Sequence, residues 1–366
     1  TAVRIVASGQ LNGVIDQLNA IVEPIMPVWS GGAWTTEAKT RNPAALFRWL
    51  HTGQAISAAD RLSESELDGA ALADWYDYCV TKGLTCDHVF DYPAGVEEAA
   101  QLTAACGYAT AAWAMGKRTA VIDDVKLPTQ LFTSETVRGF RGRIAYLDEV
   151  HALRCLFANA AAGYKPDEII VYADGYDSTT ATKFQQAEIP GKTSASDVWK
   201  AGRRLLKRAA IRRIGYEFEI DTECLVSRYG QRVLVEHFAL HREAMSARIE
   251  ALVLTSGEVT GVTLSETVTM EHGATYGLQV RRGADGTLPL FDVVNPATIG
   301  VPWSGATLTF TGAALEAFEP AVGDLVVWGR SAATVEDVSL VRLAPANDEF
   351  TATVFAVPYD EDLFSG

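Results

Sequence analysis

The feature that most constrains this fold is a long run of short strand-like segments in the second half of the chain. In the first of them Tyr216, Phe218 and Ile220 alternate with acidic residues, and this period of two indicates a strand with one buried face. Similar segments continue to residue 357, and Asp285-Gly286 marks a hairpin between two of them. Many short strands separated by turn signals predict a closed or nearly closed β-barrel.

The first third of the chain mixes predicted helices with short strands. Asn42 followed by Pro43 is a strong helix start, because Asn is a favoured N-cap and Pro fits the first helical position. The predicted elements are a strand over 2–8, a helix over 11–22, a helix from 43, helices over 67–80 and 96–106, and a strand pair around Met115-Gly116-Lys117.

The middle of the chain holds the strongest predicted helix, over 194–214, after strands expected over 139–146, 152–157 and 168–172. Ser194 and Asp197 at its start resemble a capping box, with Asp in the acidic position. The expected apolar positions of this helix are Val198, Trp199, Leu205, Leu206 and Ala209.

These patterns predict a multidomain α+β protein in which mixed α/β domains precede a β-barrel. The length of 366 residues fits two or three packed units. We expect a helix-rich α/β domain over 1–135, an α+β domain with the long basic helix over 136–222, and a β-barrel domain with closing strands over 223–366. The chain contains no stretch of 18 uncharged apolar residues, so no transmembrane segment is predicted.

Charge is unevenly distributed along the chain. The formal net charge is −15, which argues against a surface that binds nucleic acid as a whole. Residues 1–135 carry a net charge of −7, residues 136–213 of +6 and residues 214–366 of −14. A basic middle between acidic flanks suits a subunit that docks against neighbours by opposite charge, although an unevenly charged solvated surface explains it equally well.

The basic charge concentrates on the predicted long helix, where residues 200–213 include seven Lys or Arg side chains. Two interpretations remain open: a docking surface for an acidic neighbour or for DNA phosphates, or a solvated outer face. No aromatic residues interleave with these cations on their basic side, so a stable nucleic-acid complex is not expected. The candidate subunit-docking stripe consists of Lys200, Arg203, Arg204 and Lys207, with Arg208 beside them.

No motif predicts a catalytic residue, a cofactor or a metal site. Phosphate-loop, dinucleotide-binding, nucleophile-elbow and HExxH patterns are missing from the sequence. Several groups of residues are candidate sites, and each also has an ordinary structural explanation. They are His237 with His241 as metal ligands, Cys86 with His88 as a nucleophile pair, Asp174 to Asp177 as a calcium loop, and Glu217 with Glu219 as an acid/base pair.

The chain has five cysteines, an odd number, and no CxxC pair. We expect free thiols in a chain folded in a reducing cytoplasm, most of them acting as small core hydrophobes. The cysteines are Cys79, Cys86, Cys106, Cys155 and Cys224.

Several blocks of sequence resemble one protein family in the same order. TRNPAALFRWL (Thr40–Leu50) looks like the "NPA" helix start of the central tail hub, or tail-tip host-specificity, proteins of long-tailed phages, of which the phage lambda protein is the familiar member. The family extends to prophages and gene-transfer agents. The other similar blocks are Leu11–Trp29, Gln130–Phe140, Phe157–Asp177 and Asp197–Asp221.

The resemblance implies a structural virion protein without enzymatic activity. Family members form a homotrimeric ring that closes the distal tail tube, takes part in host attachment and DNA delivery, and combines β-barrels with mixed α/β domains as in baseplate hubs. The resemblance also implies that the chain folds in the bacterial cytoplasm and lies at the tail tip. There it would contact other tail-tip proteins, the distal tail protein and the tape-measure protein. The members are longer than this chain and carry receptor-reading modules, so contact with the host surface is expected to be indirect.

Two alternative functions remain open from the sequence. Tail tips often carry cell-wall hydrolases, and such an enzyme needs a catalytic constellation. A carbohydrate-binding module would need exposed aromatic platforms on the predicted barrel, for which Trp303 and Trp328 are candidates. Trp328 lies within an apolar segment and is expected to be mostly core.

Overall fold

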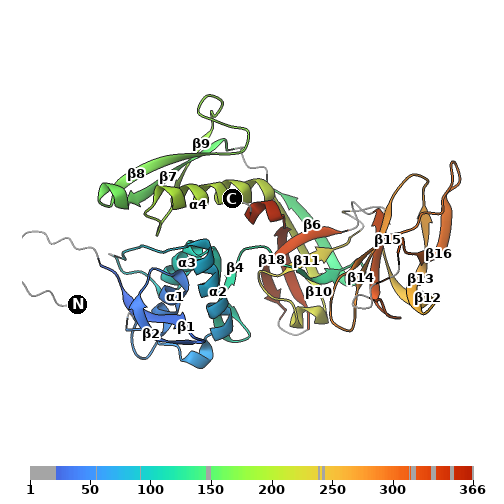
Figure 1. Ribbon diagram of the computed structural model, residues 1–366, viewed down its shortest axis with the longest axis horizontal. Helices are drawn as coiled ribbons and strands as arrows, with labels where there is room; N and C mark the ends of the chain where they lie inside the picture. The colour runs from blue at the N-terminus through green and yellow to red at the C-terminus, as the bar shows by residue number, and fades with distance from the viewer. Residues whose placement is uncertain are drawn as a thin grey trace, which may run out of the picture.

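The structure, a computed structural model, combines α-helices and β-sheets in four packed units (Figure 1). The predicted mixed α and β composition is confirmed. The predicted strand over 2–8 and nearly all of the predicted helix over 11–22 lie outside the residues that the structure describes. The structure describes residues 22–54, 56–90, 92–145, 150–237, 240, 244–312, 314, 319–330, 335–346 and 350–364.

The first unit packs three helices against two strand pairs, β1-β2 and β3-β4. Asn42 caps the first helix as predicted, because its side chain accepts a hydrogen bond from the Ala44 N–H (2.9 Å). Phe47 and Trp75 meet edge to face in the core, and the Trp75 indole donates to the Gly107 carbonyl (2.9 Å). The elements are β1 (Ile25–Ser30), β2 (Ala33–Lys39), α1 (Pro43–Thr52), α2 (Gly69–Lys82), α3 (Val96–Cys106), β3 (Ala109–Ala114) and β4 (Lys117–Ile122).

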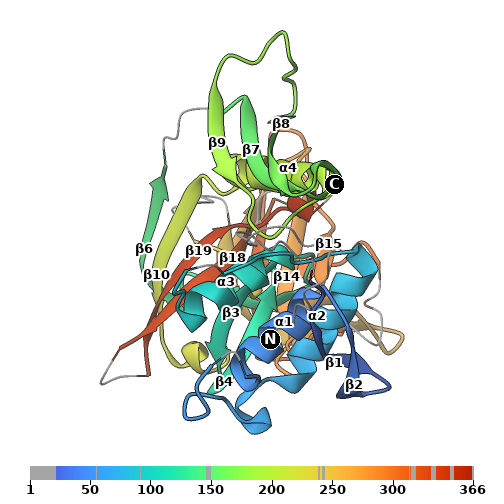
Figure 2. The same ribbon diagram turned by 90° about the vertical axis from the view of Figure 1, so that its left-hand side faces the viewer.

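The second unit is a three-stranded sheet covered on one face by a long helix (Figure 2). Strand β7 lies in the middle, antiparallel to β8 and parallel to β9. The elements are β7 (Ala152–Asn159), β8 (Lys165–Tyr172), β9 (Phe184–Glu188) and α4 (Ala195–Ile211).

Four expectations about α4 are wrong in detail. Ser194 is the N-cap residue, but its side chain makes no capping hydrogen bond, so no capping box forms. Trp199 and Leu205 are 48% and 41% exposed, Ala209 is exposed as well, and none of the three belongs to the apolar face. The helix has one narrow buried stripe because the sheet beneath it is only three strands wide, and that stripe runs through Val198 and Leu206.

The central unit is a six-stranded sheet that the chain enters several times, in the order β5-β11-β18-β19-β10-β6. As the alternation predicts, Tyr216, Phe218 and Ile220 are buried on one face. The sheet takes strands from all three predicted domains, whose boundaries remain a prediction. The strands are β5 (Pro128–Phe132), β6 (Val137–Ile144), β10 (Ile214–Ile220), β11 (Arg232–Val235), β18 (Glu336–Pro345) and β19 (Ala352–Pro358).

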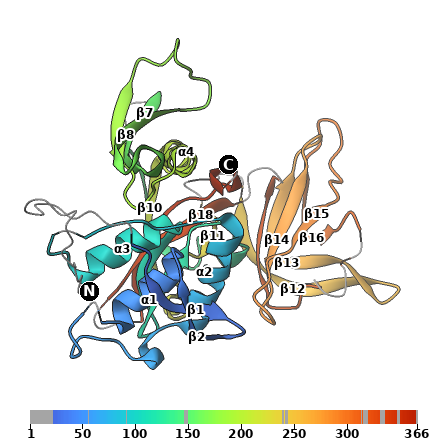
Figure 3. The same ribbon diagram turned by 60° about the vertical axis from the view of Figure 1, so that its left-hand side comes forward.

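The fourth unit is a curled six-stranded sheet with its own core, beside the central sheet (Figure 3). Its order is β15-β14-β17-β12-β13-β16, and its edge strands approach each other at a single bridge between Val293 and Phe310. The predicted closed barrel thus corresponds to a curled sheet whose edges touch at one end. The strands are β12 (Met245–Thr255), β13 (Glu258–Met270), β14 (Tyr276–Arg281), β15 (Leu290–Val293), β16 (Trp303–Thr309) and β17 (Leu325–Arg330).

Short 3₁₀ turns complete the described chain, and the last of them, η5 (Glu361–Phe364), lies against α4 in Figure 1. Among the described residues, no helix is both long and apolar enough to span a bilayer.

Candidate docking surface around helix α4

Helix α4 lies very close to its sheet, and this fixes where its charged side chains can point. Gly202 makes the approach possible: a Cβ at this position would lie 2.9 Å from Cγ2 of Val171 and 3.0 Å from Sγ of Cys155. With Val198 and Leu206 it forms the buried stripe at intervals of four residues. The cations therefore leave the helix on its flanks and its outer face.

Three of the predicted docking residues contact other parts of the same chain. Arg203 donates to the Tyr172 carbonyl (2.8 Å) and pairs with Asp174. Arg204 donates to the backbone carbonyl of Asp123, just after β4, and its guanidinium lies 4.5 Å from the Tyr108 ring centroid. These two arginines join α4 to its own sheet and to the first unit.

The third of them, Lys207, contacts the carboxyl end of the described chain. Its ammonium donates to the Asp362 carbonyl in η5 (3.0 Å). The neighbouring Phe364 ring lies 5.1 Å from the guanidinium of Arg204. The end of the chain is therefore held on α4 by two cations.

The carboxylate of Asp123 is the acidic centre of the contact between α4 and the first unit, which we call the joint at Asp123. Arg212, which follows α4, donates to both Asp123 oxygens (2.8 and 3.2 Å), and Arg204 lies 3.6 Å away. Burial raises the pKa of Asp123, but the hydrogen bond from Arg212 and the charges of Arg212, Arg204 and Arg208 outweigh burial and lower that pKa. The sequence analysis did not single out Asp123. The adjacent acids Asp123 and Asp124 at the end of a predicted strand could have marked it as a partner for the basic helix.

The predicted stripe is thus divided in two. Arg203, Arg204 and Lys207 are half-buried in contacts within the chain, whereas Lys200 and Arg208 are exposed. Helical spacing correctly groups the cations, but it does not tell which of them a second unit covers. A docking role remains a prediction, and the exposed pair is the part available to a neighbour.

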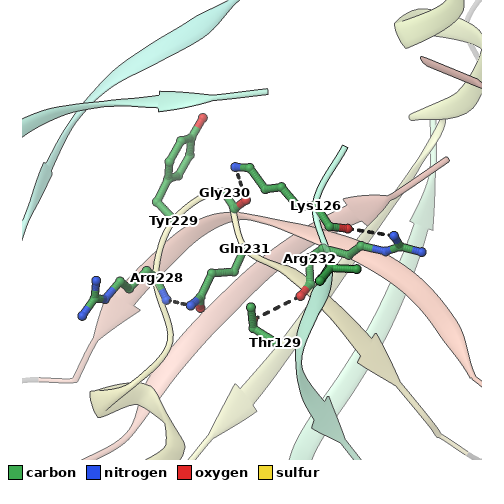
Figure 4. Close-up of a pocket in the computed structure, with 8 residues that line it drawn as sticks. Lys126, Thr129, Arg228, Tyr229, Gly230, Gln231 and Arg232 are labelled. Carbon is green, nitrogen blue, oxygen red and sulfur yellow. Dashed lines mark hydrogen bonds between the residues drawn. The ribbon is translucent and has the colours of Figure 1, made fainter. Parts of the chain in front are cut away.

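A shallow cleft of about 430 Å³ opens beside this joint (Figure 4). Two of its three cations are already engaged: Lys126 donates to the Gly230 carbonyl (2.8 Å), and Arg232 donates to Asp337 (2.6 Å) and to the Lys126 carbonyl (2.8 Å). Burial lowers the pKa of Lys126. The cleft is lined by Lys126, Leu127, Thr129, Arg228, Tyr229, Gly230, Gln231 and Arg232, a set without a carboxylate or thiol.

The candidate metal and calcium sites are not assembled in the described residues. His241 lies outside them, and His237 stacks on Phe140 with ring centroids 4.5 Å apart. Asp177 accepts from the Thr179 hydroxyl (2.6 Å) and from the N–H groups of Thr179 and Thr180 (2.8 and 2.9 Å). These hydrogen bonds make an Asx-type turn and lower the pKa of Asp177 to about 2. Within the described part of the chain, no group of three His, Cys, Asp or Glu side chains is arranged to hold a metal ion.

The members of the candidate catalytic pairs make other contacts. Cys86 lies beside Gly191 and Cys106, and His88 stacks edge to face on the ring of Phe90. On strand β10, Glu217 lies 3.7 Å from Arg143, and Glu219 is exposed.

The two tryptophans considered as sugar platforms differ. Trp328 is buried as expected and stacks on Tyr276 with ring centroids 4.9 Å apart. Trp303 is partly buried against the core of the curled sheet. The structure therefore presents neither as a fully exposed aromatic platform.

Comparison with known proteins gives weak structural matches. No family model matches the sequence, and neither does any curated protein. A chain from the virion of a native gene transfer agent particle is 10% identical, with a TM-score of 0.40, over 80% of this chain and 48% of that one. The tail protein from Neisseria meningitidis MC58 is 9% identical, with a TM-score of 0.33, over 62% of this chain and 59% of that one. This chain spans about half the length of the chains that it matches.

Proposed function

We propose that this chain is a structural subunit of a phage-type tail, placed at the tail-tip hub of a phage, a prophage particle or a gene-transfer agent. In this role it closes the distal tail tube as a homotrimer and takes part in host attachment and DNA delivery. Its partners are further copies of itself, other tail-tip proteins, the distal tail protein and the tape-measure protein. It acts by contact and without catalysis.

The observation that carries this proposal is where the family-like sequence blocks lie in the fold. Thr40–Leu50 includes the N-cap and most of α1, Gln130–Phe140 forms the end of β5 and the start of β6, Phe157–Asp177 includes β8, and Asp197–Asp221 forms most of α4 and all of β10. Helix α4 packs on β8, and β6 pairs with β10. The blocks therefore make up the framework of the chain, as expected where a family shares an architecture and not a single surface motif.

The charge distribution supports assembly through unlike surfaces. A ring of identical subunits needs a heterologous interface that closes, so each copy must present two different patches. In our proposal the exposed cations of α4 and the acidic segment 214–366, with its net charge of −14, are those patches. A ring of these subunits would also carry a net negative charge, so it would not attract DNA phosphates during delivery.

Particle formation tests this function directly. The gene would be deleted from the genome that encodes it, and the particles released after induction would be counted by electron microscopy. We expect particles without functional tails, restored by the wild-type gene in trans, and an antibody label at the distal tail end in the restored particles. Normal tails in the deletion strain, or a label confined to the head, would refute the proposal.

A separate assay tests the claim that the chain acts without catalysis. The purified chain would be incubated with peptidoglycan from candidate hosts, beside a known muramidase as the positive control. We expect no clearing above buffer. Zones of clearing that track the purified chain would favour the alternative of a cell-wall hydrolase.

A further inference from the structure

Two cysteines from separate segments meet beneath the loop that precedes α4. Cys86 follows α2 and is 7% exposed, whereas Cys106 ends α3 and is 3% exposed. The Cys106 thiol donates to the Pro190 carbonyl (3.6 Å), and both thiols lie under the same loop. Gly191 lies directly against both: an added Cβ there would collide with Sγ of Cys106 and lie 3.3 Å from Sγ of Cys86.

The two cysteine segments are held together by one buried cation. Lys192 is 4% exposed, and its ammonium donates to the Thr85 carbonyl (2.8 Å) and to the Cys106 carbonyl (2.8 Å). The Cys86 segment is fixed on its other side as well, because the Cys86 N–H donates to the Arg41 carbonyl (2.9 Å). These contacts place the thiols side by side before any reaction.

The surroundings shift the pKa values of the two thiols in opposite directions. The hydrogen bond from Cys86 lowers the pKa of Cys106, burial opposes this, and the charge of Lys192 lowers the pKa further. The same hydrogen bond, together with burial, raises the pKa of Cys86. Cys106 is therefore the thiol that ionises first and acts as the nucleophile, and Cys86 is the proton donor beside it.

We propose that Cys86 and Cys106 form a peroxide-sensitive dithiol that closes to a disulfide. The Cys106 thiolate attacks one oxygen of hydrogen peroxide, the O–O bond breaks, and a sulfenic acid forms while hydroxide takes up a proton to leave as water. The sulfur of Cys86, losing its proton, then displaces the sulfenic hydroxyl group as a second water. Two thiols give up two electrons, and one peroxide is reduced to two waters. Burial of both sulfurs favours a small oxidant over a bulky disulfide.

The inference does not depend on the proposed tail function and is tested on the purified chain. The reduced protein would be treated with hydrogen peroxide, then denatured and alkylated, and its mass and cross-linked peptides would be measured. We expect two of the five cysteines to escape alkylation, in a peptide pair that joins Cys86 to Cys106, and reduction to restore all five. Five alkylated cysteines after peroxide, or a disulfide that uses another cysteine, would overturn the proposal.

Three variants separate the roles of the thiols. Cys79→Ser is the matched control, because Cys79 is buried in the same unit and burial raises its pKa to about 12, so the disulfide should still form. Cys86→Ser should stop at a sulfenic acid on Cys106 that dimedone traps, whereas Cys106→Ser should give no dimedone adduct at Cys86. A dimedone adduct at Cys86 would contradict the assigned nucleophile. The wild-type result decides the proposal even where a serine variant folds poorly.

Discussion

At the scale of single residues, Gly202 determines how closely α4 can approach its sheet. A solvent-facing glycine in a helix would gain stability on replacement by alanine, by about 1 kcal/mol. At Gly202 the new methyl group would meet Cγ2 of Val171 at 2.9 Å and Sγ of Cys155 at 3.0 Å. Both atoms belong to a packed core that cannot retreat without moving the sheet.

We therefore predict that Gly202→Ala is destabilising, the opposite of the helix-propensity expectation. Overpacking should lower the free energy of unfolding by about 1–3 kcal/mol. Urea denaturation followed by tryptophan fluorescence measures the effect. Gly215→Ala is the control, because its added Cβ would meet no atom within 4 Å. Equal or higher stability of Gly202→Ala would show that α4 is not seated as described.

A second residue-scale prediction concerns pH and His51. Its Nε2 accepts a hydrogen bond from Nε of the buried Arg118 (2.8 Å), which requires the neutral ring. Burial and the charge of Arg118 lower the pKa of His51 from 6.5 to about 4. Between these values the unfolded chain binds a proton that the folded chain does not, so stability falls as pH drops from 6.5 towards 4. The loss amounts to about 3 kcal/mol at most.

The variant His51→Gln isolates this contribution, because glutamine keeps an acceptor for Arg118 and does not titrate. Denaturation midpoints measured from pH 7 to pH 4.5 should fall less steeply for this variant than for the wild type. His88→Gln serves as the control, since His88 is exposed. Parallel curves for the wild type and His51→Gln would mean that His51 titrates normally in the folded chain.

At the scale of elements, local signals predicted helices and hairpins well. Asn42-Pro43 and Met115-Gly116 gave the start of α1 and the turn between β3 and β4, because caps and positive-φ turns depend on adjacent residues. The sequence could not predict that β5 pairs in parallel with β11, about 100 residues further along. Nor could it show that Asp123 would neutralise part of the basic stripe. Both depend on contacts between segments that are far apart in the sequence, which periodicity does not encode.

The joint at Asp123 gives a prediction at this scale. Asp123→Asn removes the charge that faces the half-buried Arg204 and Arg212, which are left to repel each other. We expect a loss of about 2–4 kcal/mol, together with faster proteolysis of the link between β4 and β5. Because the pKa of Asp123 is lowered, this contribution is present at neutral pH and is lost as pH falls below the ordinary value of 3.8.

Thermal unfolding and limited proteolysis measure this effect. The exposed pair of Glu23 with Lys39 supplies the control, because Glu23→Gln should leave the stability nearly unchanged. Wild-type resistance to protease in Asp123→Asn would show that the arginines hold the joint through backbone carbonyls alone.

At the scale of the whole molecule, the division of the basic stripe changes how the proposed assembly into a tail must be tested. Reversing Arg203, Arg204 or Lys207 would break contacts inside the chain, so a failure to assemble would be indistinguishable from misfolding. Lys200 and Arg208 are exposed, so reversing them breaks none of these hydrogen bonds, and Arg208 acts on the joint at Asp123 only through its charge. The exposed pair is therefore the informative one.

The double variant Lys200→Glu/Arg208→Glu should fold normally and assemble poorly. Supplied to the deletion strain, it should restore at least tenfold fewer tailed particles than the wild type, since repulsion replaces attraction at an interface where close like charges cost several kcal/mol. Lys117→Glu/Lys165→Glu is the matched control, with the same change in net charge at two exposed sites on other elements. Unchanged melting temperatures would show that both variants fold. Equal numbers of tailed particles from both would mean that the exposed cations of α4 face solvent in the assembled tail.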